Sequence, residues 1–237
     1  LQINQKQFGT QHLYTAQRMN TVGLVYRDFG RMEKAGHYFR KALNIKQTHY
    51  PHEKKSIAIG QYNLAVTLLR QKKTNDALSL LQEAWQFDKN FYPRGHPYRA
   101  YTLLQLGRAY MDAGQMEQAR TNMKQAYAII GSKFDSLHSM RAENLALMAE
   151  YSIMEHHWEQ ARHYARQGKN IYASLYGKNH WKYLYCNALD QMAGILPEGG
   201  SAKLRAIRLS SKTSRLIRQH PHADPYFAQQ LNILAHL

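Results

Sequence analysis

The stretch NTVGLVYRDFGRMEKAGHYF, residues 20–39, combines helical periodicity with three glycines. Apolar side chains recur at three- and four-residue spacing on either side of Gly30, which is the pattern of two amphipathic helices. Glycine inside a helix costs about 1 kcal/mol relative to alanine, so each glycine here requires a physical reason. We expect Gly23 to let a neighbouring helix approach closely and Gly30 to end the first helix in a left-handed conformation. The stretch therefore predicts a tight helical hairpin.

Each predicted helix carries one apolar face. The face of the first helix consists of Met19, Val22, Tyr26 and Phe29. The second helix is expected to begin near Glu33, and its buried face consists of Ala35, Phe39, Ala42 and Leu43. Two such faces in antiparallel helices can cover each other and exclude water.

Small residues recur along the chain every 42 residues, which indicates a tandem repeat. One series is Ala35, Ala77, Ala119 and Ala161. Others in step with it are Ala16, Ala58, Ala100 and Ala142, and Gly23, Ala65, Gly107 and Ala149. Beyond residue 180 the frame shifts by two, and the series resumes as Cys186 and Ala228, with Ala193 and Ala235. We expect Gly107, like Gly23, to allow close helix packing.

The period predicts one array over residues 1–237. Its repeats are expected at about 8–49, 50–91, 92–133 and 134–177, with a degenerate fifth at 178–221 and the first helix of a sixth at 224–237. In the next four repeats, the turn position of Gly30 is occupied by Lys72, Gly114, His156 and Gly200. The chain starts without methionine and stops inside a repeat, which favours a segment of a longer protein.

The first repeat reads Met19-x2-Val22-Gly23-x2-Tyr26, and the third repeat reads Leu103-x2-Leu106-Gly107-x2-Tyr110. These phrases resemble the tetratricopeptide repeat, whose usual unit is about 34 residues. The sequence is similar, over roughly residues 8–237, to the longer variety found in kinesin light chains and related bacterial proteins. That variety has an A-x-x-L-N-N-L-A-x-L-Y phrase and an H-P step between repeats, seen here as His96-Pro97 and, with aspartate, in DPYFAQQLNILA at 224–235. The resemblance implies an all-α, right-handed superhelical solenoid of helical hairpins.

The resemblance also implies that the first helices line a concave groove that binds peptides. The implied peptide-binding side chains are Asn20, Thr21, Arg27, Tyr62, Asn63, Arg70, Tyr101, Gln105 and Arg108. Amide side chains can pair with an extended backbone, arginine can grip a carboxylate, and tyrosine can floor an apolar pocket. The alternative for each arginine is a solvated or salt-bridged surface residue. The family's paired asparagines are altered in several units, for example to Asp190-Gln191 in the fifth.

The chain has 32 Lys and Arg against 16 Asp and Glu, a net charge of +16, which attracts polyanions. Residues 199–220 contain six basic residues and no acid. Four of them line one stripe of a helix and could bind phosphates or an anionic membrane: Arg205, Arg208, Lys212 and Arg215. A basic solvent-facing helix is the alternative. Arg205 falls where other units have alanine, which indicates a frame shift of one residue.

No motif in the sequence predicts an enzyme: there is no glycine-rich phosphate loop, no nucleophile elbow and no convergent pair of carboxylates. We therefore predict no catalytic residue, cofactor or metal site. Two histidine groups, His156-His157 with His163 and His220 with His222 and Asp224, lack the spacing of a zinc motif. Four further histidines recur near the start of first helices, which favours an architectural role: His12, His96, His138 and His180.

The cysteine content and the apolar runs of the sequence indicate the cellular compartment in which the chain is expected. The single cysteine, Cys186, excludes an internal disulfide and suits a reducing compartment. No run of about 18 apolar residues and no signal peptide is present, so we expect no transmembrane segment and a cytoplasmic protein, in the host cytoplasm if it is a bacterial effector.

Three functional hypotheses follow from the sequence. The leading one is a non-enzymatic, adaptor-like scaffold that binds acidic or amphipathic peptide segments in a basic concave groove. The second is an array that binds nucleic acid or acidic lipid through its positive charge. The third is a regulatory or targeting module of a larger enzyme or of a secreted bacterial effector.

Overall fold

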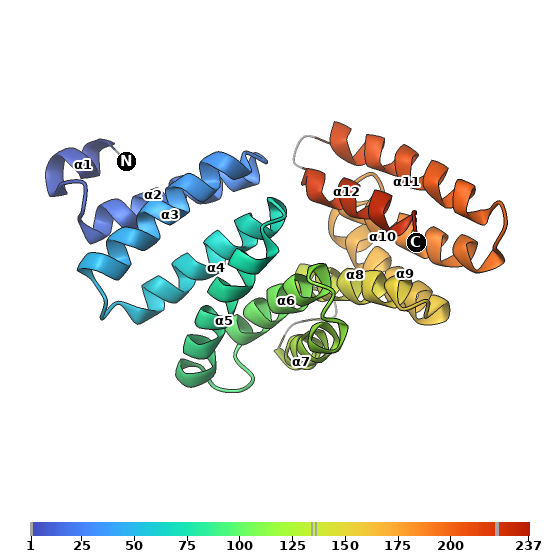
Figure 1. The fold of residues 1–237 in the computed structure, drawn as a ribbon, viewed down its shortest axis with the longest axis horizontal. Coiled ribbons are helices and arrows are strands. Elements are labelled where there is room, and N and C mark those ends of the chain that lie inside the picture. Colours follow the sequence, from blue (N-terminus) through green and yellow to red (C-terminus); the bar gives the residue numbers. More distant parts are fainter. Residues whose placement is uncertain (1, 134, 136, 221–222) are drawn as a thin grey trace. The chain divides into compact units, whose positions relative to one another are not determined.

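A computed structural model describes residues 2–133, 135, 137–220 and 223–237 (Figure 1). Over these ranges the chain consists of helices joined by short turns, so the predicted all-α class is confirmed. Its contacts divide it into two compact units, residues 1–119 and 120–237, and each is described by itself. Residue 134, where the predicted fourth repeat begins, residue 221, where the fifth ends, and His222 lie outside the described residues.

Unit 1 is built from helical hairpins (Figure 1). Its helices are α1 (Gln2–Phe8), α2 (Leu13–Asp28), α3 (Met32–His49), α4 (Lys54–Arg70), α5 (Thr74–Phe91) and α6 (Pro97–Asp112). Helices α2 and α3 form one hairpin and α4 and α5 the next, while α3 packs on α4 and α5 packs on α6. Each helix therefore covers the apolar face of both neighbours along the chain. The division between the units falls inside α7 (Met116–Lys133).

Unit 2 continues the same pattern. Its further elements are α8 (Ser139–Met154), α9 (Trp158–Tyr176), α10 (Trp181–Ile195), the 3-10 turn η1 (Leu196–Glu198), α11 (Ala202–Gln219) and α12 (Pro225–Leu234). Helices α8 and α9 form one hairpin and α10 and α11 another, with α9 packed on α10 and α12 on α11. In the described part of the chain, no helix has both the length and the apolar character needed to cross a bilayer.

The turn within each hairpin uses one left-handed residue at the predicted position. Gly30 has φ 68°, and the N–H of Arg31 donates to the carbonyl of Tyr26 at 2.8 Å, which caps the end of α2. The equivalent residues adopt the same conformation although two of them are not glycine: Lys72, Gly114, His156 and Gly200. The predicted role of Gly30 is confirmed. Lys72 and His156 therefore adopt the left-handed conformation that the turn requires, although residues with a side chain ordinarily avoid it.

The small residues that recur in the sequence are buried. All four alanines of the series that begins at Ala35 have no exposed surface, and they lie in the second helices of the hairpins. The second-helix face is as predicted, with Ala35, Phe39, Ala42 and Leu43 all buried. The predicted first-helix face is only partly buried. Met19 is buried, Val22 and Tyr26 are half-buried, and Phe29, the C-cap of α2, is 67% exposed. Phe29 lies one residue past the helix, where no neighbouring helix covers it.

Gly23 explains how α2 and α3 come so close. A Cβ atom built at Gly23 would lie 2.7 Å from Cε1 of Phe39, which is shorter than side-chain atoms tolerate. Phe39 has no exposed surface and belongs to the core of unit 1, so its ring cannot move aside. The predicted reason for Gly23 is confirmed: the missing side chain is replaced by the ring of the partner helix.

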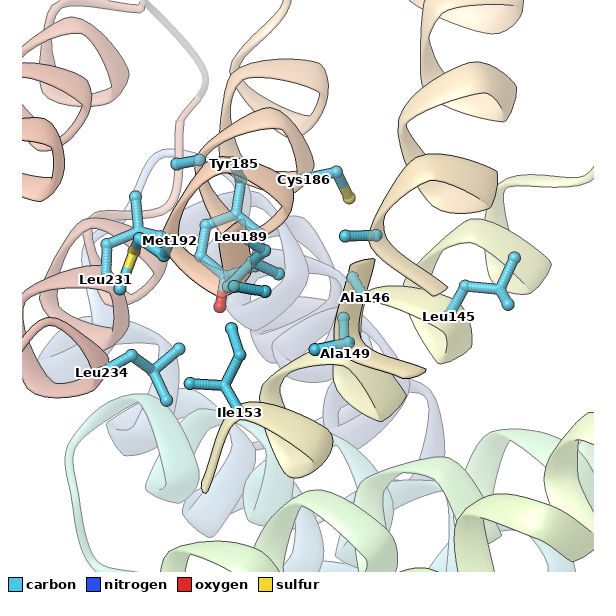
Figure 2. Close-up of a cluster of buried hydrophobic side chains, with 14 of the residues drawn as sticks. Leu145, Ala146, Ala149, Ile153, Tyr185, Cys186, Leu189, Met192, Leu231 and Leu234 are labelled. Atoms are coloured by element: carbon cyan, nitrogen blue, oxygen red, sulfur yellow. The ribbon is translucent and has the colours of Figure 1, made fainter. Parts of the chain in front are cut away.

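The core of unit 2 joins α8, α10 and α12 (Figure 2). It includes Leu145, Ala146, Ala149, Ile153, Tyr185, Cys186, Leu189, Met192, Leu231 and Leu234. Burial raises the pKa of the Cys186 thiol far above its ordinary value, so this cysteine is a packing residue and not a reactive nucleophile. On α11 the buried alanines are Ala202 and Ala206, and Arg205 is exposed, which confirms the frame shift of one residue.

The recurring histidines are helix caps. The Nδ1 atom of His12, His96, His138 or His180 accepts a hydrogen bond, 3.2 Å long, from the N–H two residues later. Asp224 caps α12 in the same way through Oδ1. Each cap satisfies a backbone donor that the first helical turn leaves unpaired. The predicted architectural role of these histidines is confirmed.

Replacing Gly23 and Gly36 by alanine should have opposite effects. Both substitutions gain about the same helix propensity, but only Gly23→Ala drives an atom into Phe39; a Cβ at Gly36 would meet nothing closer than 3.5 Å. We expect Gly23→Ala to be less stable than Gly36→Ala by about 1–3 kcal/mol, the usual cost of overpacking. Urea unfolding followed by circular dichroism measures this difference. Equal stability of the two variants would contradict the packing role of Gly23.

The His180 cap should make stability depend on pH. Burial, with His220 and Lys182 nearby, holds the pKa of His180 below its ordinary value. A lowered folded-state pKa means that the unfolded chain takes up the proton more readily, so stability present at neutral pH is lost as the pH falls below the ordinary histidine pKa. His180→Asn keeps a capping oxygen without titrating. Its unfolding midpoint should therefore decline less between pH 7.5 and 5 than that of the parent, and an identical decline would rule this out.

Candidate functional site

A hollow of about 410 Å³ lies in unit 1 on α2, α4, α5 and α6, and we call it the unit 1 hollow. Its lining residues are Arg27, Lys55, Ala58, Ile59, Tyr62, Asn63, Phe87, Asp88, Tyr92, Tyr98, Tyr101 and Thr102. Five of these belong to the residues that the repeat frame places on an inward face: Arg27, Ile59, Tyr62, Asn63 and Tyr101. The volume is that of a small ligand or of one or two peptide side chains.

One wall of the unit 1 hollow is aromatic. Tyr92, in the linker before α6, meets Tyr98 edge-on at 5.2 Å between ring centroids, and Tyr98 lies 6.3 Å from Tyr101. Phe87 meets Tyr92 edge-on at 6.1 Å. Ile59, Tyr98 and Tyr101 all keep a large exposed surface. Apolar side chains gathered at the surface of a hollow are typical of an interaction site.

A polar chain crosses the hollow from α2 to α4. The Nη1 atom of Arg27 donates to Oδ1 of Asn63 at 3.5 Å, and Nδ2 of Asn63 donates to Oδ1 of Asn20 at 3.2 Å. The Arg27 guanidinium also lies 5.9 Å from the centre of the Phe39 ring. Three predicted site residues are thereby held next to one another. Arg27 and Asn63 line the hollow, Lys55 lines it at the start of α4, and Asn20 joins it only through its hydrogen bond with Asn63.

Asp88 contributes a buried carboxylate to the same hollow. Its Oδ2 accepts a hydrogen bond from Thr102 Oγ1 at 2.5 Å. Burial raises the pKa of Asp88, against the hydrogen bond from Thr102 and the positive charges of His96 and Arg99, which lower it. The hollow therefore contains a cation from α2, Arg27, a cation from the start of α4, Lys55, and a carboxylate from the end of α5, Asp88.

Five predicted binding residues do not line the hollow, and one of them, Asn20, is linked to it by its hydrogen bond with Asn63. Thr21 is exposed on α2, donates to the carbonyl of Gln17 at 3.2 Å and borders a separate depression. Arg70 is half-buried at the end of α4, and Gln105 and Arg108 are buried on α6. Their part in binding stays a prediction. The predicted anion-binding residues Arg205, Arg208, Lys212 and Arg215 are all exposed on α11, where Arg205 pairs with Glu198.

Sequence reasoning missed the residues that close the hollow. Lys55 lies at the start of α4, Phe87 and Asp88 at the end of α5, and Tyr92 in the linker. The repeat frame considers only the inward face of first helices, so it could not select them. One signal was present in the sequence: tyrosines flank the His96-Pro97 step, where a turn brings both sides of the linker together.

The described residues contain no group of three or more His, Cys, Asp or Glu side chains placed to hold a metal ion. His222, from one of the two histidine groups noted in the sequence, is not among them.

Comparisons with known proteins agree with this architecture. Two profiles of the tetratricopeptide repeat match the sequence, one over residues 56–132 and the other over residues 16–49. Helical hairpins, left-handed turns and buried small residues define a helical-repeat protein of this class. Residues 16–49 and 56–132 match the tetratricopeptide repeat, and the fold of the chain is similar to that of solved kinesin-light-chain-like repeats. No significant match was found among curated protein sequences.

Solved structures share the fold at low sequence identity. A crystal structure of nearly identical repeats from a Podosopora anserina putative kinesin light chain, in a Q17M form, superposes with a TM-score of 0.63 at 21% identity and covers 86% of this chain and 98% of that one. The apo form of RapI gives 0.63 at 15% identity, covering 94% and 82%. The Rap conjugation gene regulator of plasmid pLS20, solved in complex with the Phr* peptide, gives 0.60 at 13% identity, covering 94% and 62%.

Proposed function

We propose that the chain is a non-enzymatic, adaptor-like scaffold that captures acidic or amphipathic peptide segments, and that the unit 1 hollow is where it holds them. The observation that carries this proposal is the presence of two cations, the amide of Asn63 with its partner Asn20, and an exposed aromatic wall at one hollow. The reducing conditions of the cytoplasm suit the single buried thiol, so we place this function there.

Each part of the hollow has a distinct task in this proposal. Arg27 and Lys55 attract a carboxylate, and a charge-assisted hydrogen bond contributes about 1.5–3 kcal/mol. The wall at Ile59 and Tyr101 covers an aliphatic or aromatic anchor, and full burial of such a side chain contributes about 1.5–3 kcal/mol. Asn20 and Asn63 can exchange their mutual hydrogen bond for bonds to the peptide backbone.

The buried carboxylate of Asp88 sets the direction of binding in this proposal. An acidic residue of the peptide would be repelled by Asp88 and attracted by Arg27, so it is expected on the α2 side of the hollow. The apolar anchor then lies toward Tyr98 and Tyr101. The complex of a protein of the same fold with the Phr* peptide supports peptide capture as a use of this architecture.

A second candidate function is suggested by α11. Its solvent-facing side carries Arg208, Lys212, Arg215 and Arg218, and no acid occurs in residues 199–220. The exposed side chain of Leu204 lies on the same side of the helix. Positive charge with an exposed leucine fits an anionic lipid surface, while the charge alone fits nucleic acid. Either role is compatible with a regulatory or targeting module of a larger protein.

Charge reversal at the hollow tests the leading proposal. A fluorescein-labelled peptide of glutamates around one leucine should bind the parent, and Arg27→Glu with Lys55→Glu should weaken binding at least about tenfold because two attractive contacts become repulsive. Arg40→Glu with Lys41→Glu, on the exposed side of α3, is the matched control and should leave binding unchanged. Fluorescence anisotropy gives both affinities.

The same assay separates peptide capture from polyanion binding. Tyr101→Ala should weaken the peptide at 0.5 M salt as well as at 0.1 M, because the apolar contribution is not screened. Equal binding by the parent and the Arg27→Glu, Lys55→Glu variant would refute the hollow as the site. Arg70→Glu, outside the hollow, then tests whether the predicted groove extends along α4.

Neutralising α11 tests the second candidate. Each basic residue near an anionic bilayer contributes about 1 kcal/mol, so Arg208→Gln, Lys212→Gln and Arg215→Gln together should lower binding to phosphatidylserine vesicles about a hundredfold. A triple variant of Arg18, Arg40 and Lys41 carries the same charge change in unit 1 and should bind like the parent. Vesicle co-sedimentation and a duplex DNA arm distinguish the two anions. Parent-like binding to both by the α11 variant would exclude this surface.

A further inference from the structure

Three cations of α9 converge on one carboxylate of α10. The Nε atom of Arg166 donates to Oδ1 of Asp190 at 3.0 Å, and Nε of Arg162 lies 3.8 Å from the same oxygen. The Nζ atom of Lys169 donates to Oδ2 at 2.7 Å and to Oδ1 of Asn187 at 3.4 Å. We call Arg162, Arg166, Lys169 and Asp190 the Asp190 cluster. All its members lie in unit 2 and belong to neither surface proposed above.

The charge of this cluster is not balanced. One carboxylate faces three cations, which leaves two positive charges in excess. Arg162, Arg166 and Lys169 stand at three- and four-residue spacing on one face of α9, where like charges repel each other. Asp190 has only 11% of its side chain exposed, and one cation would be enough to pair with it. A second anion beside the cluster would relieve the remaining repulsion.

The two arginines keep their strongest anion-binding groups available. Both approach Asp190 through Nε, and no residue in the described ranges accepts a hydrogen bond from their Nη atoms. Nε of Arg162 is itself buried without a hydrogen-bond partner among those residues. The side chains of Arg162 and Arg166 remain 36% and 52% exposed, so solvent and small solutes reach them. Paired Nη groups match the oxygens of a phosphate in two-pronged fashion.

Gly194 leaves space next to this site. A Cβ atom at Gly194 would lie 3.7 Å from Nε and 3.8 Å from Cζ of Arg162, in ordinary contact with the guanidinium. Any larger side chain there would extend across the arginine and cover it. Glycine is otherwise unfavourable within α10, by about 1 kcal/mol relative to alanine. A larger side chain at Gly194 would therefore compete with a ligand for this side of Arg162.

We propose that the Asp190 cluster is a binding site for a phosphate group. Two guanidinium groups and one ammonium present more donors than a single planar carboxylate can use, whereas a phosphate offers three oxygens and nearly two negative charges. Asp190 holds the three cations in place. Its negative charge also reduces the repulsion between them when no phosphate is bound. The phosphate can be free in solution or carried by a serine of a peptide.

A phosphate titration tests the site directly. Inorganic phosphate added to the ¹⁵N-labelled protein, at constant ionic strength with chloride, should shift the signals of the Arg166 Nε–H and the Gly194 amide in a saturable way. Arg162→Gln with Arg166→Gln should weaken binding at least about tenfold, because both two-pronged contacts are lost. Arg18→Gln with Arg40→Gln removes the same charge from unit 1 and should leave the affinity unchanged.

Substitution of Asp190 separates a binding site from a purely structural ion-pair network. Asp190→Asn keeps a side-chain oxygen that can accept from Arg166 but removes the competing negative charge, so it should tighten phosphate binding by about fivefold even if it lowers the unfolding temperature. A structural network predicts the loss of stability alone. Gly194→Leu keeps every charge and should weaken phosphate binding by covering Arg162, which provides a second test if the Asp190 variant does not fold.

Binding of a phosphorylated peptide shows whether the site takes free phosphate or a phosphate carried by a peptide. A pentapeptide with one phosphoserine among glycines should bind at least as tightly as inorganic phosphate if the ligand is peptide-borne, and more weakly if the site takes the free ion; the unphosphorylated peptide should not bind. Absence of saturable shifts with both phosphate probes would overturn the proposal. Weaker phosphate binding by a folded Asp190→Asn variant would overturn it equally.

Discussion

Close contact between paired helices is the constraint on which the rest of this structure depends. The ring of Phe39 occupies the place that a side chain at Gly23 would need, and the four alanines of the series that begins at Ala35 have no exposed surface. Helices can pack at this distance only where one of them lacks a bulky side chain. Because the requirement repeats, so do the small residues, and the repeat is visible in the sequence before any other feature.

Close packing also determines which side chains are left for binding. The second helices use their small and apolar residues against their neighbours, and the first helices are free to present amides, tyrosines and cations around a hollow. The chain of hydrogen bonds from Arg27 through Asn63 to Asn20 spans two successive hairpins. A site of this kind exists only when the hairpins are stacked, because no single repeat carries enough of its parts.

The repeat frame also shows where unit 2 departs from unit 1. Asp190 stands four residues after Cys186, as Asn20 stands four residues after Ala16, so an acid replaces an amide at the same repeat position. In unit 1 that position joins a hydrogen-bonded chain of amides, and in unit 2 it gathers three cations from α9. One substitution in a repeated frame thus gives two units different electrostatic surfaces on the same scaffold.

The sequence by itself determined the helical hairpins, the left-handed turns, the buried alanines and an architectural role for the recurring histidines. These features depend on contacts within one repeat or between adjacent helices, and the 42-residue period displays such contacts directly. The resemblance to kinesin-light-chain repeats predicted Asn20, Arg27, Asn63 and Tyr101 as binding residues, and three of these, Arg27, Asn63 and Tyr101, line the unit 1 hollow. Only the tertiary structure decided that Lys55, Asp88 and Tyr92 join them, that Arg108 is buried, and that Arg162 and Arg166 converge on Asp190. Those outcomes depend on side-chain directions and distances between neighbouring helices, which a one-dimensional period does not contain.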